Sequence, residues 1–254
     1  MRIVLITQNE PFYLAKSLKY FLGILPGHHE IVGCVVSDVS PFGKKETFFS
    51  KAKKTYRIFG LRFFTYYAVK YVLSKFGNQN RVLTLLKRNN IPTLILEKPI
   101  NDCVSVEEIR SLRPDLLISI LGNQIFKKPI LELATKGCIN LHTALLPKYR
   151  GLMPTFWVLK NQELETGVSV FFMDEGIDSG PIIVQKRIST RGLTQEDLIR
   201  VSKRIGMDAI VEAVELIGND DVEVLSNDEA KKTYFSFPTA MDVSEFRRVG
   251  AKFF

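Results

Sequence analysis

The sequence predicts an α/β fold: an open, mostly parallel, Rossmann-like sheet with helices on both of its faces. Short apolar and β-branched runs alternate with amphipathic helical segments, which is typical of parallel strand–helix–strand units. The chain has 254 residues, of which 46% are hydrophobic, enough for one large core with a small appendage. We expect a core over residues 1–190 and a C-terminal helix and tail over residues 191–254 that pack on it.

The N-terminal part of the chain predicts the first parallel units. Arg2 to Thr7 and Glu30 to Ser37 are apolar runs that we interpret as strands. Between them, Tyr13 to Leu22 has apolar residues at helical spacing, and a crossover of this length joins parallel strands in a right-handed sense. Further on, a helix over Arg81 to Asn89 leads into a short third strand, Pro92 to Glu97.

The middle of the chain continues the alternation. Ser105 to Leu112 is expected to be a helix capped by Ser105, because a serine precedes its apolar positions and Glu108 completes a capping box. The apolar segment Leu116 to Leu121 predicts a strand. Pro129 to Thr135 is expected to be a helix, and Cys138 to His142 the next strand. Parallel sheets bind ligands beyond the carboxyl ends of their strands, which places His142 at a functional position.

The second half predicts fewer but longer elements. Pro154 can begin a helix that runs to Lys160. Gly167 to Met173 and Gly180 to Ile188 are expected to be extended, joined by an acidic, glycine-rich loop. Thr194 caps a long helix that reaches about Ile217. The tail, Tyr234 to Phe254, contains turn, strand and short-helix signals without a clear period.

A basic and aromatic segment spans residues 44–88. It contains twelve lysines and arginines and one acid, Glu46, whereas the whole chain has a net charge of +8. Such a local field favours anionic partners, such as a phosphorylated substrate, nucleic acid or a membrane surface. Between Phe48 and Phe76 lie ten aromatic residues, and Gly60 is expected to separate two helical pieces.

Three interpretations of this segment stay open. In the first, amphipathic helices pack their aromatic rings inward and keep their lysines in solvent. In the second, the segment docks on a membrane or a partner protein, so that peripheral membrane contact would be seen as binding to anionic vesicles at low salt. In the third, the rings stack on nucleic-acid bases, an interpretation that we consider the weakest.

The remaining composition indicates a cytoplasmic, reduced protein. No apolar run reaches eighteen residues, so no transmembrane helix is expected. The N-terminus turns polar too early for a signal-peptide core. Cys34, Cys103 and Cys138 are odd in number and far apart, without metal spacing or a disulfide framework.

The most informative residues are an asparagine and a histidine two positions apart, followed by a distant carboxylate. Asn140 and His142 on one extended segment point to the same side of a strand. Asp178, in a glycine-flanked loop, can then close on them. An amide, an imidazole and a carboxylate that converge on one spot make a site suited to acyl-group chemistry.

The motifs around these residues resemble those of the formyltransferases that use 10-formyltetrahydrofolate. The resemblance covers roughly residues 114–190 and is carried, in order, by Asn140 to His142, Leu145 to Gly151, Thr166 to Val168 and Met173 to Ile183. That family includes glycinamide ribonucleotide transformylase, methionyl-tRNA formyltransferase and nucleotide-sugar N-formyltransferases. The resemblance implies the formyltransferase fold, with residues 1–190 as its catalytic core.

The resemblance also implies the site residues. Asn140, His142 and Asp178 match the family's catalytic triad. Gln124, Ile125 and Phe126 match its pterin-binding hinge in position, and the loop residues Asp174, Glu175, Gly176 and Ile177 match its folate-binding loop. The implied cosubstrate is 10-formyltetrahydrofolate, and no metal is implied.

The expected acceptor follows from two features that the sequence lacks. The first strand is followed by Gln8 to Phe12, which lacks the glycine-rich cradle expected for a ribonucleotide phosphate. The chain is expected to be too short after the core for a full tRNA-binding domain. We therefore expect a small primary amine, that of a nucleotide-linked amino sugar, rather than nucleic acid. The alternatives are a methionyl-tRNA formyltransferase-like enzyme and a hydrolase of 10-formyltetrahydrofolate.

Overall fold

The computed structural model describes residues 1–39, 47–76, 81–122 and 124–254. Over these residues the main sheet has seven strands, in the order β3-β2-β1-β4-β5-β7-β8. The strands are β1 (Arg2–Gln8), β2 (Glu30–Ser37), β3 (Thr93–Leu94), β4 (Leu116–Ile120), β5 (Cys138–His142), β7 (Glu165–Phe172) and β8 (Ile182–Ser189). Neighbouring strands from β3 to β5 are parallel, whereas β7 is antiparallel to both of its neighbours, β5 and β8. The predicted mostly parallel α/β class is confirmed.

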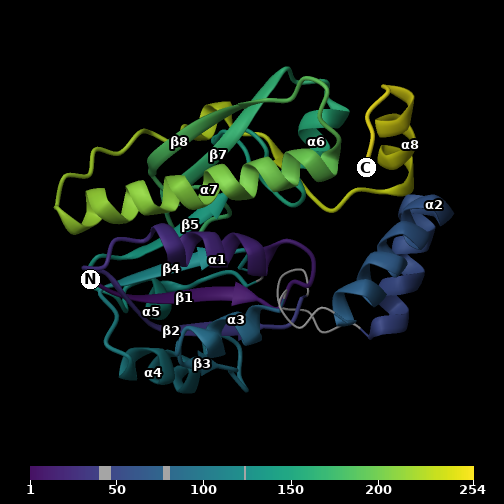
Figure 1. The fold of residues 1–254 in the computed structure, drawn as a ribbon. Helices are drawn as coiled ribbons and strands as arrows, with labels where there is room; N and C mark the ends of the chain where they lie inside the picture. The colour runs from purple at the N-terminus through teal and green to yellow at the C-terminus, as the bar shows by residue number, and fades with distance from the viewer. Residues whose placement is uncertain (40–46, 77–80, 123) are drawn as a thin grey trace.

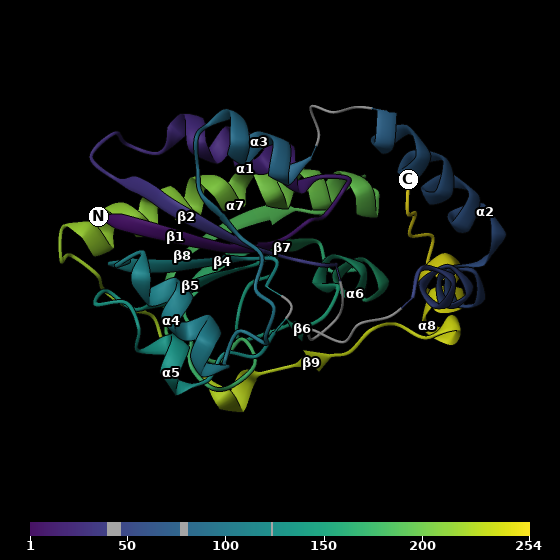
Figure 2. The ribbon, with the colours of Figure 1, turned by 90° about the horizontal axis from the view of Figure 1, so that it is seen from below.

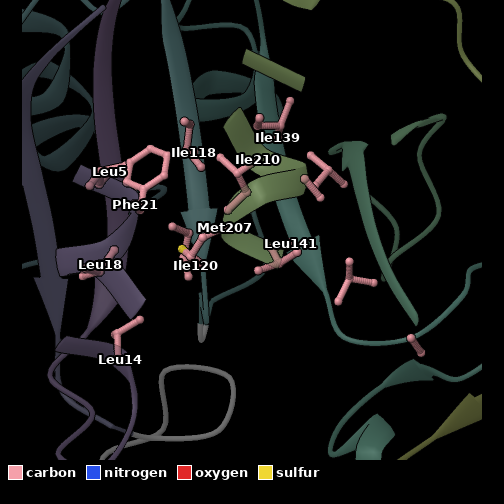
Figure 3. Packing of buried hydrophobic residues seen from close by; sticks show 14 of the residues in the cluster. Leu5, Leu14, Leu18, Phe21, Ile118, Ile120, Ile139, Leu141, Met207 and Ile210 are labelled. Atoms are coloured by element: carbon pink, nitrogen blue, oxygen red, sulfur yellow. The ribbon is translucent and has the colours of Figure 1, made fainter. Parts of the chain in front are cut away.

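Helices cover both faces of the sheet (Figures 1 and 2). One face carries α1 (Leu14–Ile24), α3 (Val82–Arg88) and α7 (Gln195–Gly218), and the other carries α4 (Cys103–Ser111) and α5 (Lys128–Leu131). Successive strand residues point to opposite faces, so Leu5 joins the core under α1 while Val4 joins the core under α4. Figure 3 shows the first of these cores, where Phe21 of α1 and Met207 of α7 pack against strand residues.

The chain after β8 lies against the core. Phe246 of α8 (Ala240–Arg248) stacks on Phe156 of α6 (Pro154–Lys160), with ring centroids 4.8 Å apart. The short strand β9 (Tyr234–Phe235) pairs in parallel with β6 (Arg150–Gly151), just after β5. The 3-10 turn η3 (Glu229–Lys231) lies between α7 and β9. The tail therefore reaches the loop that follows His142.

The helix α2 (Phe48–Phe76) lies beside α8 at one end of the molecule (Figures 1 and 2). Gly60 has a non-helical φ of 78°, so the predicted division into two helical pieces is confirmed. Several rings pack inward, as expected for amphipathic helices: Phe59 is buried in the core, and Phe63 stacks on it with centroids 4.4 Å apart. The basic and aromatic segment also includes residues 44–46 and 77–80, which lie outside the described residues.

One lysine of α2 does not lie in solvent as the charge pattern predicted. Lys70 Nζ is 2.7 Å from the carboxylate of Glu196 at the start of α7, and it also donates to the Tyr13 hydroxyl. Burial raises the pKa of Glu196, but hydrogen bonds from Lys70, Arg200 and Tyr66 outweigh that effect and hold the pKa at about 2. This ion-pair cluster, with Glu196 buried at its centre, connects α2 to α7.

Three predicted boundaries were wrong. The helix expected from Ser105 begins at Cys103, because Asp102 caps it by accepting from the Val104 N–H, while the Ser105 hydroxyl donates to the Lys98 carbonyl. The helix expected over Pro129 to Thr135 ends at Leu131, and the strand expected over Pro92 to Glu97 has two paired residues at the sheet edge. None of these differences moves a site residue. Among the described residues, no helix combines the length and the apolar character needed to span a bilayer.

Lys203 of α7 is a buried cation. Its exposed fraction is 8%, and it has no hydrogen bond or ion pair within the described part of the chain. Burial lowers the pKa of Lys203 from 10.5 to about 8, and the negative charge of Glu10 offsets part of this effect. The folded state therefore holds this charge at a cost to stability.

Replacing Lys203 with methionine is expected to raise the free energy of unfolding at about pH 7 by up to about 3 kcal/mol, because one unit of pKa shift corresponds to about 1.4 kcal/mol. The difference should shrink as the pH rises from about 8 to 10.5, since the folded chain then releases a proton that the unfolded chain still holds. Urea unfolding of both proteins at about pH 7 and about pH 10 measures this. A variant less stable than wild type at the lower pH would contradict it.

Candidate active site

The end of β5 presents Asn140 and His142 on the same side of the sheet, as their spacing predicted. Asn140 lines a cavity, and its side-chain amide has no hydrogen bond among the residues that the structure describes. The His142 ring is buried behind it, with an exposed fraction of 7%. The strand thus places a free amide at the cavity wall and an imidazole beneath the surface.

The two ring nitrogens of His142 face different partners. Nε2 is 2.7 Å from the backbone carbonyl oxygen of Tyr149, and because that oxygen can only accept, Nε2 carries a proton. Nδ1 is 3.5 Å from Oδ2 of Asp178, which is too long for a strong hydrogen bond. Nδ1 is therefore the ring nitrogen that can engage either Asp178 or a bound group.

Asp178 reaches the site from the loop between β7 and β8. Its backbone has a φ of 50°, in the left-handed region, and its Oδ2 accepts the Gly151 N–H at 2.8 Å. Gly151 itself has a φ of 98°, and a Cβ there would lie 2.3 Å from the Phe235 carbonyl oxygen, so only glycine fits this position. Backbone in these sparsely populated regions persists only where its surroundings hold it.

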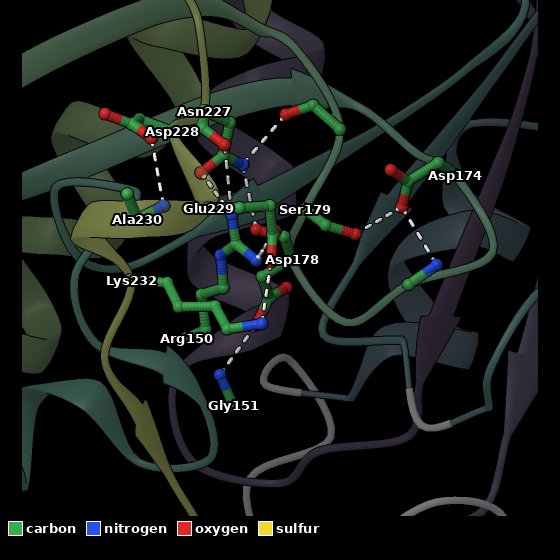
Figure 4. A network of polar contacts seen from close by, with 12 residues as sticks. Arg150, Gly151, Asp174, Asp178, Ser179, Asn227, Asp228, Glu229, Ala230 and Lys232 are labelled. Atoms are coloured by element: carbon green, nitrogen blue, oxygen red, sulfur yellow. Dashed lines mark hydrogen bonds and ion pairs between the residues drawn. The ribbon is translucent and has the colours of Figure 1, made fainter.

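The C-terminal tail supplies the residues that hold this loop (Figure 4). The side-chain amide of Asn227 donates to the Asp178 and Gly180 carbonyl oxygens at 2.9 and 2.8 Å. Its side-chain oxygen in turn accepts from the guanidinium of Arg150, which also pairs with Glu229. One network therefore connects the tail, the strand after His142 and the Asp178 loop.

The cavity at this site has a volume of about 280 Å³. It is lined by eight of the ten residues predicted from the sequence, namely Asn140, Asp178, Gln124, Ile125, Phe126, Asp174, Gly176 and Ile177. The other two do not line it: His142 lies behind Asp178, and a Glu175 carboxylate oxygen accepts the Lys128 N–H instead. Within the predicted hinge, the Gln124 side chain is already bonded to the Ile100 N–H.

Several lining residues were not predicted. Ser119 of β4 pairs with Asn140 in the sheet, and its buried hydroxyl has no hydrogen-bond partner among the described residues. Gly122 lies against it, and a Cβ there would be 2.5 Å from the Ser119 Oγ. Gln8 at the end of β1 and Phe237 of the tail also line the cavity. The end of β1 was a signal for Gln8, since it lies at the carboxyl edge of the sheet.

The sheet edge brings a free amide and a carboxylate to one cavity, with an imidazole behind the carboxylate, and these groups suit acyl-transfer chemistry. The chain belongs to the formyl transferase family, whose profile matches residues 71–214. The resemblance seen in the motif residues is thereby confirmed.

Curated relatives and solved structures extend this comparison. Methionyl-tRNA formyltransferase from Clostridioides difficile (strain 630) is 37% identical over 166 residues, which is 64% of this chain and 52% of the relative. The chain spans about half the length of the curated relatives it matches.

The fold is shared with structures of lower identity. The N-formyltransferase from Helicobacter canadensis, crystallised with folinic acid and dTDP-3-aminofucose, has a TM-score of 0.63 at 20% identity, covering 97% of this chain and 79% of that one. Glycinamide ribonucleotide transformylase 1 from Symbiobacterium toebii has a TM-score of 0.62 at 18% identity, covering 89% and 94%.

Proposed function

We propose that this chain is an N-formyltransferase that moves a formyl group from 10-formyltetrahydrofolate to the primary amine of a nucleotide-linked amino sugar. The observation that carries the proposal is that Asn140 and Asp178 line one cavity and that Nδ1 of His142 lies 3.5 Å from Oδ2 of Asp178. When bound, 10-formyltetrahydrofolate supplies the carbonyl carbon that the amine attacks. The chain supplies the groups that respond to the charges created by that attack.

Asn140 and His142 act on the formyl oxygen. This oxygen gains negative charge as the amine attacks, and the unpaired amide of Asn140 is a neutral donor at the cavity wall. Because Nε2 of His142 is occupied by the Tyr149 carbonyl, Nδ1 is the atom that can present a second, charged donor. A preorganised donor of this kind contributes roughly 2.7–4 kcal/mol to barrier lowering.

Asp178 acts on the protons. Its carboxylate lies beside His142, where it orients the imidazole and stabilises the imidazolium. The attacking amine becomes acidic as its bond to carbon forms, and Asp178, or a water that it holds, accepts the proton. The bond between the formyl carbon and the cosubstrate nitrogen then breaks, and that nitrogen takes up a proton as tetrahydrofolate leaves. The Gly151 N–H fixes Oδ2 in place, so the carboxylate does not need to reorganise during the reaction.

The cavity fits the pterin part of the cosubstrate. Ser119 presents a buried hydroxyl without a partner among the described residues, which a polar ring edge satisfies. Ile125, Phe126 and Phe171 supply apolar walls for a flat ring. The Asp174 to Asp178 loop closes one side, as the family resemblance implied for its folate-binding loop.

The acceptor proposal is supported by the end of β1. There the Glu10 carboxylate accepts the backbone N–H groups of Phe12, Tyr13 and Leu14, at 2.8 to 2.9 Å. A side chain of the protein thus fills the cradle of N–H groups in which a substrate phosphate would bind, which disfavours a ribonucleotide phosphate there. The fold match with the dTDP-3-aminofucose complex extends over 97% of the chain.

Methionyl-tRNA is the second candidate acceptor. It is favoured by the name of the curated relatives and by the basic segment 44–88. Its amine would meet the same three side chains, so the chemistry at Asn140, His142 and Asp178 does not distinguish the two acceptors.

The test follows tetrahydrofolate release from 10-formyltetrahydrofolate by the purified chain. The panel contains dTDP- and UDP-linked amino sugars, methionyl-tRNA and no acceptor. Release only with one sugar supports the proposal and identifies the acceptor, whereas release only with methionyl-tRNA replaces it by the second candidate. Equal release without any amine indicates the hydrolase.

Replacing Asn140 with alanine is expected to lower turnover by roughly 10²–10³-fold, the loss seen when one oxyanion donor is removed. The KM for the amine should change little, because the amide acts on charge that exists only in the transition state. Steady-state kinetics with varied amine measure both quantities. A variant that changes only KM would assign Asn140 to substrate binding instead.

A further inference from the structure

A second cavity, of about 450 Å³, opens between α1, α2 and α7 and shares no lining residue with the active-site cavity. Its lining contains five cationic side chains, Lys16, Lys70, Arg200, Lys203 and Arg204, and no aspartate or glutamate. A concave surface of this size with charge of one sign suits a small organic anion.

The buried cation at this cavity lacks a protein partner. Lys203 has an exposed fraction of 8%, with no hydrogen bond or ion pair among the described residues. The nearby Glu10 does not neutralise it by contact, since the Glu10 oxygens accept three backbone N–H groups. A buried ammonium is usually paired, so its free donors point to a ligand that completes the site.

The neighbouring acids do not cancel the remaining charge. Glu196 is shared between Lys70 and Arg200, and Asp208 accepts from the Tyr20 hydroxyl. Lys16 has no ion pair within the described chain, and the Arg204 guanidinium lies over the Tyr20 ring. At least three of the five cations therefore keep charge available for an anion.

We propose that this cavity is a second ligand site, which binds the phosphate groups of an organic phosphate ester through Lys16, Lys203 and Arg204. Ammonium and guanidinium groups form charge-assisted hydrogen bonds with phosphate oxygens, and Tyr20 with its stacked Arg204 offers a flat surface beside them. The site lies among α1, α2 and α7 and shares no lining residue with the active-site cavity, so its occupant is distinct from the formyl acceptor.

Two sources can present the same phosphate chemistry. Lys70 and Leu73 also line an adjoining apolar groove with Val69 and Phe254, where an acyl chain would lie if the phosphate belonged to a lipid. A soluble ester would occupy the basic cavity alone. The experiment therefore has one arm for each source.

The first arm titrates the full chain with inorganic pyrophosphate at low salt, by calorimetry. Lys16→Ala and Lys203→Met are each expected to weaken binding by about tenfold or more, the loss expected for one charge-assisted hydrogen bond. Lys19→Ala is the matched control, because Lys19 is an exposed lysine of the same helix outside the cavity lining. Lys19→Ala and the active-site variant His142→Ala should bind as wild type does.

The second arm measures sedimentation with phosphatidylcholine vesicles that contain phosphatidylglycerol. If the phosphate belongs to a lipid, the chain should bind the vesicles, Lys203→Met should weaken that binding, and pyrophosphate should reverse it. If the ligand is a soluble ester, pyrophosphate should bind as in the first arm, and vesicle binding should not depend on Lys203 or on pyrophosphate. The proposal is overturned if neither pyrophosphate nor vesicle binding depends on Lys16 and Lys203, or if Lys19→Ala causes the same loss. Because Lys16 is exposed, its variant tests the site even if Lys203→Met alters folding.

Discussion

Replacing His142 with alanine is expected to reduce formyl transfer by about 10³-fold or more, since the charged donor to the formyl oxygen is lost and Asp178 loses the imidazole beside it. The change removes the ring that connects the Tyr149 carbonyl to Asp178, and no other described histidine lies near the site to replace it. Single-turnover measurement of tetrahydrofolate release separates this loss of chemistry from any change in binding.

Two controls accompany this variant. His28→Ala removes an exposed histidine on the other side of the fold, where it pairs with Glu215, and should keep normal turnover. Binding of folinic acid by His142→Ala should stay close to that of wild type, because His142 lies behind Asp178 and its proposed contact with the formyl oxygen forms only as charge develops there. Near-normal turnover of His142→Ala would remove the histidine from the proposed mechanism.

The pairing of Asn140 with His142 could be predicted because it depends on local geometry alone. Residues two apart on a strand share a side, and the apolar run before them identified the strand. The place of Asp178 was expected from its glycine-flanked loop and from the family motifs. It depends on the pairing of β7 with β5, which brings the next loop back to the strand end. Both predictions concern residues within one continuous motif region.

The residues that hold the site could not be predicted in the same way. Asn227 contacts Arg150 across 77 positions, and it lies between the long helix and the tail, in a stretch for which the sequence predicted no element. Ser119 lies in an apolar strand, where a serine ordinarily indicates nothing about a ligand. Such contacts arise from tertiary packing, and a single sequence carries little signal for them.

For the same reason, the ion pair of Lys70 in α2 could not be predicted from the sequence. A lysine among aromatic residues on a helix predicts a solvated charge, because burial without a partner is costly. Lys70 is instead paired with Glu196, a residue 126 positions away at the start of α7. The sequence contains both residues but does not indicate that they are in contact.

Replacing Asp178 with asparagine is expected to lower turnover by about 10³-fold while the loop keeps its conformation. An asparagine side chain still accepts the Gly151 N–H through its oxygen, and the Asn227 contacts to the loop go to backbone carbonyls that the change does not touch. The variant therefore removes the negative charge beside His142 and the proton acceptor, but not the scaffold.

Ligand binding and unfolding distinguish a loss of chemistry from a loss of structure at the site. Asp178→Asn should bind folinic acid and unfold at the same urea concentration as wild type, whereas Asn227→Ala should loosen the loop and weaken folinic acid binding as well. Asp221→Asn, an exposed acid outside the site, is the matched control and should leave turnover unchanged. If Asp178→Asn instead loses folinic acid binding in proportion to turnover, the carboxylate serves to shape the cavity, and another group must take the proton from the amine.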